Sequence, residues 1–105
     1  MAQFDVYANP NPQARDWLPY VVDVQSNLLS NLRTRLVIPL SSQPHEASPR
    51  PRRLTPVFVV AGQRLALQPQ LAAHLDARAL RKARASLAGH MGEIRDALDA
   101  VVSGI

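Results

Sequence analysis

Hydrophobic and polar residues alternate over several short stretches of the chain, and this pattern predicts a mainly β structure. We expect strands at residues 3–8, 20–25 and 35–40, because β-branched and aromatic residues recur there with a period of two. Pro39 lies inside the third stretch, and proline has no amide hydrogen to donate to a ladder. The sequence therefore predicts that this strand lies at a sheet edge or ends near Pro39.

A hairpin and a loop are predicted in the middle of the chain. Residues 57–60 and 65–67 are apolar, and the segment between them contains Gly62, which takes positive φ angles freely. This arrangement is typical of two strands joined by a tight turn. Residues 41–53 hold three prolines and almost no apolar side chain, which predicts an exposed loop.

The last part of the chain has the periodicity of an amphipathic helix, and we expect this helix over about 87–103. Ser86 suits its N-cap, and Gly104 suits its C-terminal stop. Apolar residues at intervals of three or four predict one buried face, formed by Leu87, Met91, Ile94, Leu98 and Val101 or Val102.

Length and composition indicate one small globular domain over residues 1–105. Hydrophobic residues make up 47% and charged residues 19% of the chain, which is ordinary globular usage. A chain of this size without cysteine has no disulfide framework, so we expect self-association to add stability. No apolar run approaches the roughly 18 residues of a membrane span, and we expect a cytoplasmic protein that does not bind membranes.

The basic charge by itself does not predict nucleic-acid binding. The net charge is +4, and the basic residues gather in two runs, Arg50–Arg53 and Arg78–Arg84. Neither run is interleaved with the aromatic residues on which single-strand binders stack bases. We therefore expect a solvated basic surface, with direct nucleic-acid contact as the alternative.

Motifs for metal or cofactor chemistry are missing from the sequence. His45, His74 and His90 are far apart in the chain and do not form the helical pair of a zinc protease. There is no phosphate-binding glycine loop and no serine nucleophile elbow. We therefore predict no catalytic residue, no metal site and no cofactor.

Five segments together resemble the CcdB family, the toxins of a class of bacterial toxin–antitoxin modules. They occur in the family's order in a chain of nearly the family's length, and residues 54–105 follow its pattern without a gap. The specific motifs are Val-Asp-Val-Gln-Ser and Val-Ile-Pro-Leu, since neither arises from simple alternation. The segments are Gln3–Tyr7, Val22–Ser26, Leu36–Leu40, Leu54–Val57 and Ser103–Ile105.

The resemblance implies a fold shared with MazF-type toxins: a twisted antiparallel sheet of SH3-like barrel character with a C-terminal helix, assembled as a homodimer. It also bears on residues 71–84, where Ala, Leu and Arg favour a helix by propensity. The family has a strand over about 71–80. We expect the strand, because tertiary context overrides propensity, with residues 81–85 linking it to the helix.

The resemblance further implies a poison that is not an enzyme. Members of the family bind the A subunit of DNA gyrase and trap its cleaved-DNA complex. A CcdA-like antitoxin neutralises them, and they contact DNA only indirectly, through the toxin–antitoxin complex that represses its own operon. The gyrase-binding residues would be Ser103, Gly104 and Ile105. Potent members carry Trp-Gly-Ile there, and an aromatic hot spot is commonly worth about 2 kcal/mol, or roughly thirtyfold in affinity.

Two alternatives remain open from the sequence. A ribonuclease of the MazF type would need a base and a cation near the scissile phosphate. The candidates are Arg33, Arg35, His45 and Glu46, and they could serve only if the loop after Leu40 is ordered; a surface strand and a solvated pair are the favoured explanations for them. The other alternative is a degenerate, non-toxic homologue that acts only in antitoxin binding and operon repression.

Overall fold

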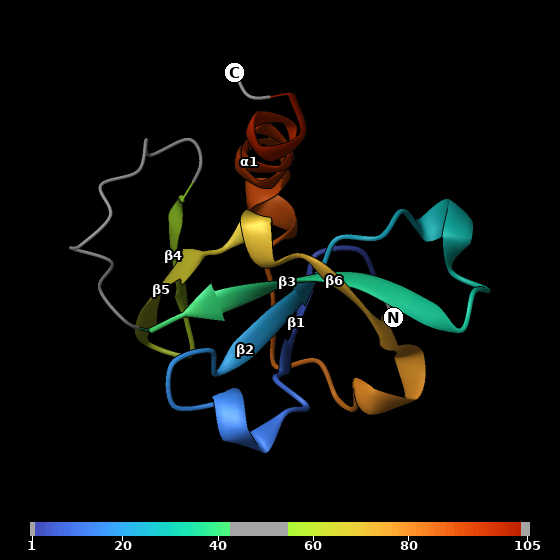
Figure 1. Cartoon of the computed structure of the whole chain (residues 1–105), viewed down its shortest axis with the longest axis horizontal. Helices are drawn as coiled ribbons and strands as arrows, with labels where there is room; N and C mark the ends of the chain where they lie inside the picture. Colours follow the sequence, from blue (N-terminus) through green and yellow to red (C-terminus); the bar gives the residue numbers. More distant parts are fainter. Residues whose placement is uncertain (1, 43–54, 104–105) are drawn as a thin grey trace.

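The computed structural model describes residues 2–42 and 55–103. Within them, seven strands form one antiparallel, nearly closed barrel-like sheet, and α1 (Met91–Ser103) is the C-terminal helix (Figure 1). The predicted fold class, mainly β with a C-terminal helix, is confirmed. The strands are β1 (Asp5–Ala8), β2 (Tyr20–Asp23), β3 (Thr34–Ser41), β4 (Val57–Val60), β5 (Gln63–Leu67), β6 (Ala73–Asp76) and β7 (Ala85–Ser86).

The sheet is built around β3. Its order is β4-β5-β3-β2-β1-β7, and β6 also pairs with β3. In the described part of the chain, five short 3-10 helices lie in the connections. They are η1 (Pro12–Ala14), η2 (Asn27–Leu29), η3 (Pro69–Leu71), η4 (Ala77–Ala79) and η5 (Ala88–His90).

Pro39 lies in a central strand, so the predicted sheet-edge position was wrong, but β3 ends at Ser41, close to Pro39, as the alternative prediction has it. On one side β3 pairs with β2 through Val21 and Pro39. On the other side β3 pairs with β6 as far as Val37, which lies opposite the first residue of β6, and with β5 from Leu40 on, which lies opposite the last residue of β5. The carbonyl of Pro39 accepts a hydrogen bond from Gln68 on this second side. The missing amide hydrogen of Pro39 therefore falls where β3 changes partners, and no ladder bond is lost there.

The first strand begins two residues later than predicted, because Phe4 has a φ of 72°. A residue in the left-handed region cannot continue a strand. The amide of Phe4 donates to the carbonyl of Asp23, and its own carbonyl accepts from Leu87. Phe4 is thus held between β2 and the segment leading into α1, with its ring in the core.

The predicted hairpin is confirmed as β4 and β5. Val60 pairs with Gln63, so Ala61 and Gly62 form a two-residue turn. Their φ angles are 52° and 78°, the two positive values that a type I′ turn requires.

Residues 71–84 form no α-helix, which confirms the choice of a strand over the local propensity. The strand is shorter than expected: β6 covers Ala73–Asp76, between η3 and η4. Its pairing with β3 supplies the hydrogen bonds that replace those of a helix. The expected link over 81–85 was one residue too long, because Ala85 and Ser86 form β7 against β1.

The C-terminal helix begins at Met91, later than the predicted residue 87. The amide of Leu87 donates to the carbonyl of Phe4 at 2.8 Å, and Ser86 accepts a hydrogen bond from the amide of Ala88. These bonds belong to the sheet and to η5, so the hydrogen bonds of the α-helix begin only after η5.

The predicted loop 41–53 begins later than expected. Ser41 is part of β3 and is 1% exposed, and Ser42 donates a backbone hydrogen bond to Trp17. Residues 43–53 lie outside the described residues.

Two apolar clusters cover the two faces of the sheet, because neighbouring strand residues point to opposite sides. The larger cluster is enclosed by α1 and the β4–β5 hairpin, and it includes Val6, Val22 and Ile38. The smaller cluster lies on the opposite face and consists of Tyr7, Val21, Val37 and Leu80, with Leu75 packed against it.

Candidate protein-binding site at the C-terminal helix

The start of α1 is fixed against the hairpin. The ring of His90 packs on Phe58 of β4 with 4.9 Å between the ring centroids. Its Nδ1 lies 3.0 Å from Oε1 of Glu93, and a carboxylate in the first turn suits the positive end of the helix dipole. The orientation of α1 is therefore set at its first turn.

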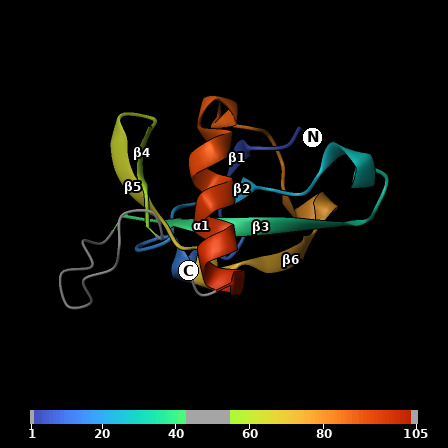
Figure 2. The same cartoon turned by 90° about the horizontal axis from the view of Figure 1, so that it is seen from above.

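The inner face of α1 is narrower than the periodicity predicts. Ile94 and Ala97 are completely buried and Leu98 packs against the same cluster. Met91, which the sequence places on this face, is 41% exposed. α1 starts at Met91 and lies across the strands (Figure 2), and Ile94 is its first buried residue.

The far end of α1 presents apolar side chains outward. Val101 is 40% exposed and Val102 is 84% exposed. The helix also packs against η3, where Leu71 is 40% exposed. We call Leu71, Met91, Val101 and Val102 the helix patch. Apolar side chains left in water on one element are a common mark of a protein-binding surface.

Ser103 is the last residue of α1 and is exposed. Its hydroxyl donates a 2.6 Å hydrogen bond to the carbonyl of Asp99, one turn earlier. The expected binding residues Gly104 and Ile105 lie outside the described residues. The structure therefore places Ser103, of these three, next to the exposed Val102 at the accessible end of the helix.

The Val-Asp-Val-Gln-Ser motif has a structural explanation. Asp23 forms an enclosed ion pair with Arg35. The side chain of Gln25 accepts from the amide of Leu36 and donates to the carbonyl of Leu29, and Ser26 caps η2 by accepting from the amide of Leu28. The motif thus ties the segment after β2 to β3.

This segment carries a second group of exposed apolar residues that the sequence analysis missed. Leu28 is 92% exposed, and Leu29 and Leu32 are each 47% exposed. The available signal was the pair Leu28-Leu29 in a turn-forming Ser-Asn segment, because in η2 these leucines have no sheet face to cover.

Of the four predicted ribonuclease residues, Arg33 and Arg35 lie in the part of the chain that the structure describes. Arg35 is 1% exposed and bound to Asp23, so neither a phosphate contact nor a solvated surface position is correct for it. Arg33 is exposed near Asp76, and His45 and Glu46 lie outside the described residues. Among the described residues, no three His, Asp or Glu side chains are placed to hold a metal ion.

The fold and the site define a small, barrel-like β domain whose C-terminal helix ends in exposed apolar side chains. The family model described as CcdB protein matches residues 3–104. The chain therefore belongs to the CcdB family, the toxins of toxin–antitoxin modules. No curated protein matches the sequence. Within the described residues, no helix has the length and apolar character needed to cross a bilayer.

Proposed function

We propose that this protein poisons DNA gyrase by binding its A subunit through residues 103–105 and trapping the cleaved-DNA complex. The observation that carries the proposal is the exposed end of α1, where Val102 and Ser103 lie outside the packed core. The family match runs through the same end of the chain. Binding there needs no movement of the sheet, because the buried contacts of α1 end at Leu98 and earlier residues.

The proposed mechanism is binding and not catalysis, and it takes place in the cytoplasm, where gyrase acts. The toxin stabilises one intermediate of another enzyme's reaction, so it requires shape and apolar contact but no acid, base or cofactor. A CcdA-like antitoxin releases gyrase by covering the toxin, and a disordered partner that folds on binding can wrap a domain of this size. The toxin–antitoxin complex then represses its own operon.

The proposed active form is a homodimer. Within the helix patch, Leu71, Met91 and Val101 leave apolar surface in water that a second copy of the chain can cover, while Val102 stays free for gyrase. Burial of such surface contributes roughly 25 cal/mol per Å². A twofold axis near α1 would bring two C-terminal ends together, so that two weak contacts act on one target.

The experiment is gyrase-mediated cleavage of supercoiled DNA with purified toxin. Deletion of residues 103–105 should abolish linear product and leave folding unchanged. Ser103→Trp should lower the toxin concentration that is needed to produce linear DNA. The reason is that an indole adds an aromatic surface worth about 2 kcal/mol, or roughly thirtyfold in affinity. The substitution also removes the hydroxyl that now bonds to Asp99.

Val102→Ser and Val59→Ser form a matched pair of controls. Both valines are highly exposed, at 84% and 68%, but Val59 lies on β4, away from the helix end. Only Val102→Ser should reduce cleavage. If neither the wild-type protein nor Ser103→Trp yields linear DNA with gyrase of the host, the gyrase proposal is wrong and the non-toxic homologue takes its place.

A further inference from the structure

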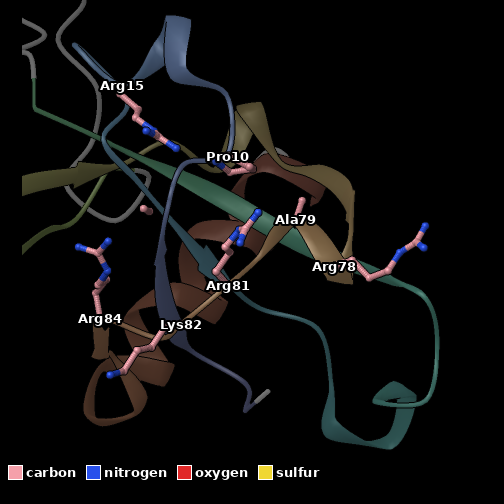
Figure 3. Close-up of a pocket in the computed structure, with 8 residues that line it drawn as sticks. Pro10, Arg15, Arg78, Ala79, Arg81, Lys82 and Arg84 are labelled. Carbon is pink, nitrogen blue, oxygen red and sulfur yellow. The ribbon is translucent and has the colours of Figure 1, made fainter.

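A hollow of about 430 Å³ lies between the loop that carries η1 and the segment from η4 to β7 (Figure 3). Its wall is formed by the end of β1, by the loop carrying η1, and by the segment from η4 to β7. The basic run Arg78–Arg84 folds here beside Arg15, which is distant in sequence. The lining residues are Ala8, Pro10, Arg15, Arg78, Ala79, Arg81, Lys82 and Arg84.

The charge of this hollow is positive and largely uncompensated. Four arginines and one lysine line it, and no acidic residue does. Arg78 is committed to Asp76 through a 3.0 Å ion pair, which lowers the pKa of Asp76 to about 2. Arg81, Lys82 and Arg84 are exposed and form no ion pair with any described residue. Like charges gathered at one place repel one another unless an anion binds.

Two of the arginines, Arg15 and Arg81, are directed into the same part of the hollow. The Nε of Arg15 donates a 2.7 Å hydrogen bond to the carbonyl of Asn9, which fixes the direction of its guanidinium. Figure 3 shows Arg15 pointing toward Pro10 from above and Arg81 reaching up from below, while Arg84 stands apart on the left and Arg78 points away to the right. Lys82 extends outward, so the positive charge continues beyond the hollow. Planar guanidinium groups match phosphate oxygens with paired hydrogen bonds.

The composition of the wall favours phosphate over an acidic peptide. A peptide that orders on binding needs large apolar side chains for its anchors, since ordering it costs conformational entropy. Here the uncharged wall residues are Ala8, Pro10 and Ala79. The exposed leucines and valines lie elsewhere, on η2, β4 and the helix patch.

We propose that this basic hollow binds the phosphodiester backbone of a nucleic acid, by charge and without reading sequence. The hollow holds one or two phosphates, and Lys82 continues the contact along the strand. This differs from the expectation that DNA is contacted only indirectly. It is independent of the gyrase proposal, because the hollow and the end of α1 share no residue.

The test is binding of a fluorescently labelled DNA duplex and a labelled single strand to the full chain, measured by anisotropy at increasing salt. Contact with about three phosphates predicts a slope near −2.7 for duplex in a plot of log affinity against log salt. Arg81→Glu with Arg84→Glu should weaken binding at least tenfold and flatten that slope. The single variants Arg81→Gln and Arg84→Gln, tested separately, give smaller losses in the same direction.

The matched control is Arg64→Glu with Arg95→Glu, which changes the net charge equally. Both residues are exposed, on β5 and α1. The control should weaken binding no more than about threefold, because it lowers only the overall positive charge that attracts DNA. Equal losses of DNA affinity in the two double variants would show that the hollow binds DNA no better than any other basic surface of the protein.

Competing anions show which kind of negatively charged molecule the hollow prefers. Tripolyphosphate and polyglutamate are added at equal charge concentration to the labelled DNA complex. DNA should be displaced by unlabelled DNA and weakly by tripolyphosphate. The proposal would be overturned if polyglutamate displaced the labelled DNA as effectively as unlabelled DNA does. It would also be overturned if the protein bound no DNA at low salt. If tripolyphosphate bound where DNA does not, the hollow would be assigned to a small phosphate compound instead.

Discussion

Arg35 and Asp23 form an ion pair that is sealed inside the sheet, with Nη2 of Arg35 2.7 Å from Oδ2 of Asp23. Their side chains are 1% and 0% exposed. The Nε of Arg35 donates to the same oxygen at 2.8 Å, and the second oxygen of Asp23 accepts from the amide of Gln25. The pair therefore joins β3 to β2 and also fixes the turn that follows β2.

Removal of one partner of this pair should destabilise the fold strongly. Arg35→Met leaves the carboxylate of Asp23 buried without its counter-ion, and such a loss typically costs about 3–5 kcal/mol. The matched control is Arg78→Met, which breaks an exposed pair with Asp76 and should leave the melting temperature nearly unchanged. Thermal melts of the two variants provide the measurement. Equal melting temperatures would show that the Arg35 pair contributes no specific stability.

The same pair marks the limit of what the sequence predicts. The alternation around Val22 and Val37 is enough to predict two paired strands, because burial of one face needs only a period of two. It gives no reason to expect that Arg35 points inward. Its partner Asp23 lies 12 positions earlier, and only the register of β2 against β3 brings the two together.

Other features were predicted or missed for similar reasons. The turn at Gly62 was predictable, since its conformation depends on two adjacent residues. The short strands β6 and β7 exist only through pairing with β3 and β1, so local propensity could not show them. The exposed position of Ser103 could be expected from the helix pattern, but the hollow joins Arg15 to residues 78–84, and a contact so distant in sequence leaves no local signal.

The register of α1 gives a second prediction. Ala97→Asp should cost several kcal/mol, because Ala97 is completely buried against the sheet and a carboxylate there has no partner. Met91→Asp should cost little, since Met91 is 41% exposed. The loss of unfolding free energy in Leu98→Asp should lie between these two, because Leu98 is partly buried at the side of the cluster. Denaturant titration ranks the three variants, and a larger loss for Met91→Asp than for Ala97→Asp would refute this register.

Tyr7 predicts how stability depends on alkaline pH. Burial, followed by the negative charges of Asp5 and Asp23, raises the pKa of Tyr7 above its ordinary value of 10.0. The folded state thus favours the neutral phenol. The stabilisation of the folded state by the neutral phenol is fully present below pH 10.0, which is the pKa expected for Tyr7 in the unfolded chain. This stabilisation is lost as the pH rises through the raised pKa of the folded state.

Two variants check this prediction. In Tyr20→Phe, the near-ultraviolet absorbance of tyrosinate reports Tyr7 alone, since the chain has two tyrosines, and it should develop above pH 10.0. In Tyr7→Phe, the loss of stability at alkaline pH should be smaller than in the wild-type protein. Titration of Tyr7 at or below its ordinary pKa would contradict the buried environment described here.

The homodimer is the last prediction, and it rests on the helix patch. Light scattering at micromolar concentration should give twice the chain mass of 11.5 kDa. Leu71→Glu places a charge on η3 beside α1 and should shift the protein to the monomer, because an unpaired charge in an apolar interface costs a few kcal/mol, or on the order of a hundredfold in Kd. Val57→Glu is the matched control: Val57 is similarly exposed, at 49% against 40% for Leu71, but lies on β4. It should leave the mass unchanged. A single-chain mass for the wild-type protein would exclude the dimer, and loss of the dimer in Val57→Glu alone would move the interface from α1 to the outer face of the hairpin.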